Sequence, residues 1–287
     1  MVRSVDAETI RRLCHASASA CRRSRAGRLD VAADFGEASG DRESQIDAGK
    51  VDTETGWRDV KVATFAVRAP AAPRTSEGHG DRDLPEPSVR HVIAGIEAAE
   101  AFGTRCAAAA VEVGLPDVKR LTVLGDGAAW IRNLAGEHFG GAEQAVDVFH
   151  ATGYLADLAR AGFGADAAAA QAWTDRAQLA LPADGWAGVC EFVHEAKAEA
   201  SDPAAVEAAF PRVANYLAGH QGRMTYAARL RRGASAGRGM IEGAIKQLVG
   251  RRIKQTGARW RSEHIGPMVE FVSLGHTEDW DAYWSAA

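Results

Sequence analysis

Leu121-Thr122-Val123-Leu124-Gly125-Asp126-Gly127 is a short apolar run that ends abruptly in a turn. Four consecutive apolar or β-branched residues predict a buried strand, and a helix is expected to follow through about Phe139. Asp126 would then stand at the carboxyl end of a strand, where α/β sheets place ligands and catalytic groups. An Asp-Gly pair is also the usual turn dipeptide, so this aspartate taken alone is equally compatible with a plain turn.

The segments on either side of this run also indicate an α/β fold. Residues 60–67 carry β-branched side chains at a period of two and predict a strand, whereas 69–87 are rich in Pro, Gly, Ser and charge and predict a loop. Residues 89–113 have apolar side chains along one helical face and predict a helix. A further short strand is expected at 146–149, running into a helix at His150.

The rest of the chain is mainly helical in pattern. Residues 153–220 are Ala-rich, with breaks at Pro182, Gly185 and Pro203, and predict a helical insertion. A helix is expected from about Met240 to Gln255. Another is expected from Glu263, followed by an aromatic tail with Trp280, Tyr283 and Trp284.

Composition limits the kinds of protein that this chain can be. With 287 residues, 46% of them hydrophobic, it has enough apolar material for one large domain or one domain with an insertion. The four cysteines show no metal-binding spacing, and no apolar stretch is long enough to span a membrane. The N-terminal residues lack the apolar core of a secretory signal. We therefore expect a cytoplasmic protein with reduced thiols.

The formal charge of −4 hides a strongly basic segment at residues 223–261. Its one acidic residue is Glu242, as expected of an active-site ligand among phosphate-binding groups. The alternative is an ordinary solvated basic surface. The cations of this segment are Arg223, Arg229, Arg231, Arg232, Arg238, Lys246, Arg251, Arg252, Lys254, Arg259 and Arg261.

Three acidic residues far apart in the chain have the order expected of a two-metal site. Asp47 falls in a predicted strand segment, Asp126 follows a later strand, and Glu242 is on a predicted helix. Mg²⁺ prefers hard oxygen ligands, and two such ions can activate an attacking oxygen and neutralise a leaving one. If the three carboxylates converge, they can therefore hold two Mg²⁺ ions, for which Mn²⁺ can substitute.

Other residues are candidates for supporting roles. Asp147 and His150 form an Asp-x-x-His pair, which is either a helix N-cap with a nearby histidine or a pair that positions substrate. A zinc site is disfavoured because no cysteine accompanies the pair. On the helix expected to carry Glu242, Lys246 lies nearest the acid at 100° per residue. The remaining candidates for DNA contact are Arg251, Arg252, Lys254, Arg259 and Trp260, of which Trp260 either stacks on a base or packs in the core.

Taken together, these phrases resemble bacterial insertion-sequence transposases of the Kra type. Those proteins are DDE enzymes on an RNase H-like fold, distantly similar to Mutator-type and hAT transposases. The resemblance covers roughly residues 45–285 and rests on the order and joint presence of six phrases. They are residues 46–50, 56–62, 124–131, 146–151, 241–247 and 254–260.

The resemblance implies a fold, a domain organisation and a set of roles. Asp47, Asp126 and Glu242 would form the DDE triad that holds the metal ions, and Asp147 and His150 would be the family's supporting Asp-x-x-His element. The RNase H-like core would comprise residues 45–150 and 236–287, interrupted by a helical insertion at 151–235. Residues 1–44 would be an N-terminal remnant, partly helical or disordered.

The implied function is metal-dependent DNA cleavage and strand transfer. The partners would be transposon ends and target DNA but no membrane, and the protein would form homo-oligomers on DNA. Alternatives are an RNase H-like nuclease without strand transfer, an inactive or domesticated DNA-binding remnant, and an unrelated α/β domain.

The chain departs from the family pattern in three places. Family members carry a longer N-terminal region with DNA-binding elements, so an N-terminally truncated copy is expected. The family's Gly-Ser-Gly before the glutamate is Gly237-Arg238-Gly239 here, and the residues before Asp47 do not match, which leaves Asp52 as an alternative first acid.

Overall fold

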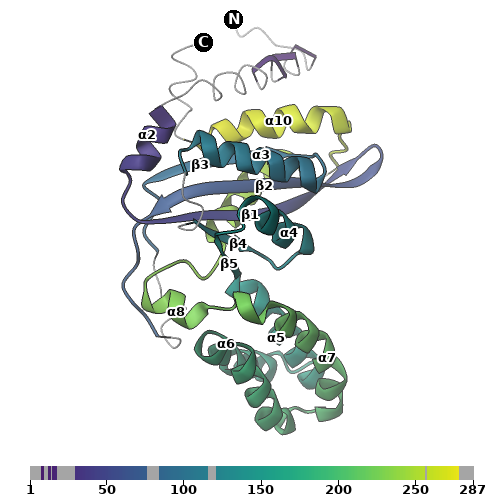
Figure 1. Ribbon diagram of the computed structural model, residues 1–287. Helices are drawn as coiled ribbons and strands as arrows, with labels where there is room; N and C mark the ends of the chain where they lie inside the picture. Colours follow the sequence, from purple (N-terminus) through teal and green to yellow (C-terminus); the bar gives the residue numbers. More distant parts are fainter. Residues whose placement is uncertain are drawn as a thin grey trace, which may run out of the picture.

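The computed structural model describes residues 8–9, 12–13, 15–17, 30–75, 84–115, 121–255 and 257–277. Within these residues the protein is an α/β fold built on a five-stranded mixed sheet with the strand order β3-β2-β1-β4-β5. Helices cover both faces of the sheet, and a separate lobe of helices lies below it (Figure 1). The prediction of an α/β fold is confirmed at this level.

The first half of the sheet is an antiparallel meander. Helix α2 (Asp30–Glu37) leads into strand β1 (Asp41–Thr53), which pairs with β2 (Gly56–Arg68), and β2 pairs with β3 (Val89–Gly95). The period-two pattern that predicts a strand at 60–67 is therefore confirmed. Strand β1 pairs with β4 only as far as Gln45, so the rest of β1 continues with β2 as a two-stranded ribbon.

The second half of the sheet is parallel. Helix α3 (Ala99–Glu112) connects β3 to β4 (Leu121–Gly125), and α4 (Ala129–His138) connects β4 to β5 (Glu143–Val146). Strand β4 pairs in parallel with both β1 and β5. All five residues of β4 are buried, as its continuous apolar run predicts.

Two hydrophobic clusters sandwich the sheet. One lies between the sheet and helices α3 and α4, and it contains Ile46, Phe65 and Phe102. The other includes Val62 and Val92 and lies against the C-terminal helices described below. Because side chains alternate along a strand, Asp47 points toward the second cluster while its neighbour Ile46 points toward the first.

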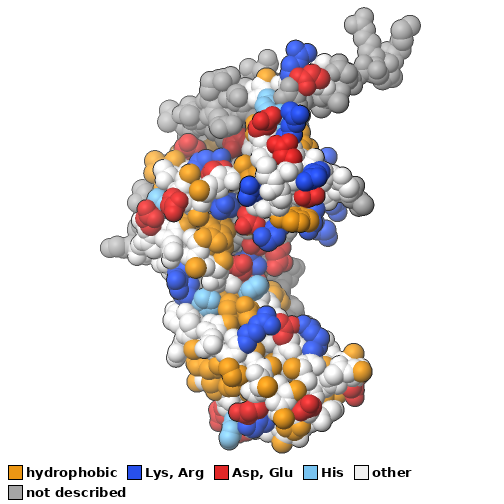
Figure 2. Space-filling view, turned by 90° about the vertical axis from the view of Figure 1, so that its right-hand side faces the viewer, with side chains coloured by type: hydrophobic (Ala, Val, Ile, Leu, Met, Phe, Trp, Pro, Cys, Tyr) orange, Lys and Arg blue, Asp and Glu red, His pale blue; other side chains and the backbone are white. Residues whose placement is uncertain are grey.

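The predicted insertion is helical, as its Ala-rich pattern indicates. It comprises α5 (Val148–Phe163), α6 (Ala167–Ala196), η2 (Lys197–Glu199), α7 (Pro203–His220), η3 (Gln221–Arg223) and α8 (Tyr226–Arg231). Pro182 and Gly185 mark a kink in α6, where Gly185 has a φ of 62°, and Pro203 begins α7. These helices enclose a hydrophobic cluster of their own and form the lower lobe, which joins the sheet through a narrower waist (Figure 2).

The C-terminal segment returns to the sheet. Helix α9 (Gly239–Ile245) continues into the π-helical turn η4 (Lys246–Gly250), and α10 (Ser262–Leu274) follows. Gly49 on β1 lets η4 approach closely, since an added Cβ there would lie 3.0 Å from Val249 Cγ1 and 3.2 Å from Ile245 Cγ2. None of the helices in the described ranges combines the length and apolar character needed to cross a bilayer.

Three expectations about secondary structure are wrong. Residues 89–95 form strand β3, and the helix begins only at Ala99, because pairing with β2 outweighs the helical spacing of the apolar residues. Val148 and Phe149 belong to α5 rather than to a strand. The expected regular helix to Gln255 ends at Ile245 and becomes π-helical. The positions of Arg251 and Lys254 relative to Glu242 therefore do not follow from a rotation of 100° per residue. The predicted tail with Trp280, Tyr283 and Trp284 lies outside the described residues.

The close contact at Gly49 gives a test of this packing. Gly49→Val should lower the free energy of unfolding by about 1–3 kcal/mol, because the new side chain overpacks the interface between β1 and η4. Gly136→Ala is the matched control, since Gly136 lies within α4 and a Cβ added there would meet nothing within 4 Å. Alanine there should raise stability by roughly 0.5–1 kcal/mol. Urea unfolding of both variants measures the difference, and equal effects would contradict this packing.

Candidate active site

Asp47 lies within β1, whereas Asp126 and Asp147 each follow directly after a strand, β4 and β5 respectively. The parallel ladder of β1 and β4 ends at Gln45 and Leu124, two residues before Asp47 and Asp126, and that of β4 and β5 ends at Gly125 and Val146, one residue before Asp126 and Asp147. Asp147 N–H still donates to Gly125 O, 2.9 Å away. Neighbouring strands are about 4.8 Å apart. The carboxyl ends of β4 and β5 therefore bring Asp126 and Asp147 to the middle of the long strand β1.

Arg238 ties two of these acids together. Its Nη1 lies 2.7 Å from Asp47 Oδ2, and its Nε lies 3.2 Å from Asp147 Oδ2. The Asp147 side chain is only 1% exposed and that of Arg238 only 6%, so both charges are withdrawn from water. Burial opposes the charge on Arg238, but Asp47 and Asp147 outweigh it, and the pKa of Arg238 is raised. The guanidinium therefore stays charged between the two carboxylates.

Asp126 is held from both its side chain and its backbone. Its Oδ1 accepts from the Ala128 N–H at 2.8 Å, which fixes the turn after β4. Its carbonyl accepts from the Tyr216 hydroxyl of α7 at 2.7 Å. Gly127 has a φ of +91°, and a Cβ there would come within 2.4 Å of His220 Nε2. The glycine is therefore required both by its backbone conformation and by the close approach of α7.

An aromatic group from the insertion covers this end of the sheet. Tyr216 stacks on Tyr154 with ring centroids 3.9 Å apart, and His150 packs against each of these rings at 5.8 Å. Burial, followed by Tyr154 and then by the charges of Asp126 and Asp147, raises the pKa of Tyr216, so its hydroxyl stays a neutral donor. The two residues of the Asp-x-x-His pair therefore make different contacts. Asp147 Oδ1 caps α5 by accepting from Phe149 N–H, and His150 joins the aromatic group.

Glu242 is exposed on α9, one helical turn after Arg238, since its N–H donates to Arg238 O at 3.0 Å. Helix α9 is fixed to β1 by Gln45, whose side-chain oxygen accepts from Ile241 N–H at 3.0 Å. Gln45 and Asp47 share one face of β1, so α9 crosses the sheet on the side to which Asp47 points. Lys246 follows Glu242 after another turn and is exposed as well. Glu242 and Lys246 are therefore on the helix that Arg238 begins.

The site has hard oxygen donors, although the described residues contain no group of three or more His, Cys, Asp or Glu side chains arranged to hold a metal ion. Mg²⁺ is commonly held by one or two carboxylates together with water and substrate phosphates. Asp47, on β1, and Asp126, directly after the adjacent strand β4, are the candidates for that mode. Asp52 does not, because it lies five residues farther along β1 on the opposite face, opposite Trp57.

The predicted DNA-contacting residues fall into different environments. Trp260 packs against the hydrophobic cluster of the C-terminal helices, and its Nε1 donates to Ile253 O at 2.8 Å, so it is a core residue. Arg259 donates to the backbone carbonyls of Thr53 and Glu54. Lys254 lies over the ring of Trp57, with Nζ 5.7 Å from the centroid. Arg251 and Arg252 are exposed.

The contacts of three residues of this region are not predicted by the sequence, although Arg238 is one of the basic residues of segment 223–261 expected to bind phosphate. For these contacts Arg238 carries no sequence signal beyond its place between two glycines, because its role depends on partners from distant strands. Tyr216 is one aromatic residue in a long Ala-rich segment. Trp57 is 58% exposed at the ribbon of β1 and β2, and its place directly after the turn glycine Gly56 was the available signal.

In comparisons with known proteins, no family model and no curated protein matches the chain.

The buried charge on Arg238 gives a second test. Arg238→Met should destabilise the protein by about 3 kcal/mol, because it leaves Asp147 buried without its cation. Adding Asp147→Asn should recover part of this loss, since the second change removes the unpaired charge. Arg176→Met is the control: its partner is Glu199, both side chains are about half exposed, and the loss should stay below about 1 kcal/mol. Urea unfolding of the three variants and the parent chain measures these losses, and a loss at Arg238 no larger than at Arg176 would contradict the assignment.

Proposed function

We propose that this protein is the catalytic domain of a DDE transposase, which cuts DNA at the ends of an insertion sequence and joins those ends to a target. The observation that supports the proposal is that Asp47 and Asp126 each lie two residues beyond the last pair of the β1–β4 ladder, while Gln45 fixes α9, which carries Glu242, to the same face of β1. Asp47, Asp126 and Glu242 are the three residues that the resemblance to Kra-type transposases implies as the triad. They come from segments that the chain separates by long distances.

The strand arrangement supports an RNase H-like core as part of this proposal. An antiparallel meander of three strands is followed by two parallel strands, and the first strand lies at the centre of the sheet. Such a core has its first acid on the central strand, its second after the neighbouring parallel strand, and its third on a helix packed across them. In this proposal Asp47 on β1, Asp126 after β4 and Glu242 on α9 would correspond to these acids, with the helical insertion between the second and third.

The reaction needs an activated oxygen and a stabilised leaving oxygen. Two Mg²⁺ ions, when bound, would supply both by polarising the attacking water and neutralising the departing 3′-oxygen. Asp47 and Asp126 would supply carboxylate oxygens from the sheet, and Glu242 would supply one from α9. Lys246, one turn beyond Glu242, is placed to contact a phosphate of the bound strand. The freed 3′-hydroxyl would then attack a phosphorus of the target DNA and displace the 3′-oxygen of the target strand, with no covalent enzyme intermediate.

In this proposal DNA binds to a small region near the β1–β2 ribbon rather than to a uniformly basic face. Lys and Arg side chains are interspersed with Asp and Glu on the face shown in Figure 2. The ribbon of β1 and β2 projects beyond β4 from the level of Asp47 (Figure 1). Near its turn the exposed Trp57 ring, with Lys254 beside it, offers an aromatic surface and a cation. A DNA strand running from the acids along this ribbon would meet both.

Metal-dependent cleavage tests the proposal. Asp126→Asn and Glu242→Gln should each lower Mg²⁺-dependent nicking of DNA by more than about a hundredfold, because each removes a charged ligand. Asp126→Asn retains the side-chain oxygen that accepts from Ala128 N–H, so the turn should survive. Glu137→Gln, on the exposed side of α4, is the control and should retain activity. DNA binding is measured in parallel, and cleavage that persists in both acid variants would refute the assignment.

Strand transfer separates a transposase from a nuclease of the same fold. Pre-cut DNA ends with a free 3′-hydroxyl are incubated with the protein, Mg²⁺ and target DNA. Covalent joining supports the transposase, whereas hydrolysis without joining supports the nuclease.

One observation favours a second candidate, a DNA-binding remnant that no longer cuts. Arg238 stands where the family has serine, and its guanidinium neutralises Asp47 and Asp147. An arginine in this place competes with a cation for the Asp47 oxygens.

Arg238→Ser distinguishes these two candidates. In a remnant that Arg238 has silenced, the serine variant should gain Mg²⁺-dependent nicking of at least about tenfold over the parent chain, because Asp47 is freed to bind a cation. In an active transposase, the parent chain should cut and the variant should gain nothing. Thermal unfolding curves check that both proteins are folded. If the parent chain nicks DNA as strongly as the serine variant does, the remnant is excluded.

A further inference from the structure

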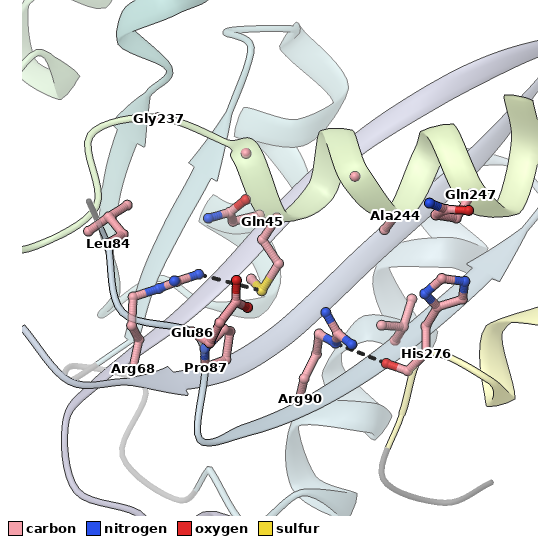
Figure 3. Close-up of a pocket in the computed structure, with 14 residues that line it drawn as sticks. Gln45, Arg68, Leu84, Glu86, Pro87, Arg90, Gly237, Ala244, Gln247 and His276 are labelled. Atoms are coloured by element: carbon pink, nitrogen blue, oxygen red, sulfur yellow. Dashed lines mark hydrogen bonds between the residues drawn. The ribbon is translucent and has the colours of Figure 1, made fainter. Parts of the chain in front are cut away.

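A cavity lies along one side of α9. Its volume is about 540 Å³, within the range of small-molecule sites. Residues 239, 243 and 247 line it and lie along one side of the helix. This side is about 100° around the helix axis from the side that carries residues 238, 242 and 246. The opposite wall comes from the end of β2, residues 84–87 and β3 (Figure 3). Asp47, Asp126 and Glu242 do not line the cavity, although Gln45, which fixes α9 to β1, and Gly237, next to Arg238, do.

Two arginines and a histidine line this cavity, and one of the arginines has no carboxylate partner among the described residues. Arg68, Arg90 and His276 line it, and the charge on Arg68 is balanced by Glu43, which is 3.1 Å away and buried. Arg90 donates through Nε to the carbonyl of His276 at 3.0 Å, and no ion pair joins it to a carboxylate within the described ranges. Its guanidinium points across the cavity toward α9 (Figure 3). Arg90 is thus a cation whose outer nitrogens face the cavity.

His276 adds no positive charge to the cavity. Burial, followed by Arg90 and Arg252, lowers the pKa of His276, so its imidazole is favoured in the neutral form. Glu86 is the acidic side chain among the lining residues that the structure describes, and it is exposed. A guanidinium with free outer nitrogens is well suited to bind a phosphate with two parallel hydrogen bonds.

The remaining walls suit the organic part of a ligand. Leu84, Pro87 and Met240 give an apolar surface, while Glu86 and Gln247 offer an acceptor and an amide. Gly243 leaves the α9 wall open, since a Cβ there would meet nothing within 4 Å. The space is larger than an inorganic anion requires. A planar base with a sugar could lie against the apolar wall with its edge toward the polar groups.

We propose that this cavity binds a mononucleotide, with the phosphate on Arg90 and the nucleoside between the 84–87 segment and α9. The proposal uses none of the residues Asp47, Asp126 and Glu242, so it stands or fails independently of the transposase assignment.

Calorimetric titration of the full chain tests the site. The ligands are the four ribonucleoside 5′-monophosphates, with adenosine and inorganic phosphate as partial ligands. At least one monophosphate should bind saturably and more tightly than either partial ligand. Arg90→Gln should weaken that binding at least about tenfold, as expected for a lost charge-assisted hydrogen bond. Arg58→Gln, which removes an exposed arginine from the far end of β2, should leave it unchanged.

Gly243→Leu provides a second variant that keeps every charge. The leucine would fill the open wall of the cavity and should weaken binding at least about tenfold, and a thermal unfolding curve checks that the variant is folded. The proposal is overturned if no monophosphate binds, if inorganic phosphate binds as tightly, or if neither variant changes the affinity. A 5′-phosphorylated single-stranded oligonucleotide is the last arm. Tighter binding of it than of any monophosphate, lost in the same variants, would overturn the assignment to a free nucleotide.

Discussion

The buried guanidinium of Arg238 is the interaction on which the geometry of the acidic edge depends. It joins Asp47 on β1, Asp147 at the start of α5, and the first turn of α9. Removing such charges from water is expensive, and the cost is offset only when all partners are in place. The guanidinium therefore makes the positions of a central strand, an insertion helix and the Glu242 helix dependent on one another.

A second buried arginine performs a similar task at the outer edge of the sheet. Arg229 of α8 is 1% exposed and contacts Glu143 of β5 at 3.0 Å, while its Nε donates to Ser235 O. Burial acts to raise the pKa of Glu143, but Arg229 and Arg232 outweigh it, and the pKa is lowered. The chain leaving the helical lobe is thus fixed to the sheet by ion pairs at both ends of residues 229–238. This segment sets where α9 begins, and hence where Glu242 lies.

The sequence was informative where a local pattern and the tertiary fold agree. The apolar run before Asp126 predicted strand β4 and the position of this acid at its end, and the Ala-rich segment predicted a helical insertion. It failed for β3, whose apolar spacing also fits a helix and whose extended form is decided by pairing with β2. Arg238 could not be found by pattern, because a buried charge is recognisable only through partners such as Asp147, 91 residues away. The π-helical turn after α9 has no comparable signal, and the close approach to Gly49 is what accommodates it there.

The bond from the Tyr216 hydroxyl to the Asp126 carbonyl spans 90 residues, and Gln45 reaches Ile241 across 196. Contacts of this sequence separation are formed only after long loops have closed, which makes folding slow. The meander of β1, β2 and β3 and the helical lobe are held by much more local contacts and can form first. The edge that gathers the aspartates is consequently the last part of the molecule to be assembled. A chain released from the ribosome would pass through a stage with both bodies formed and the aspartates still apart.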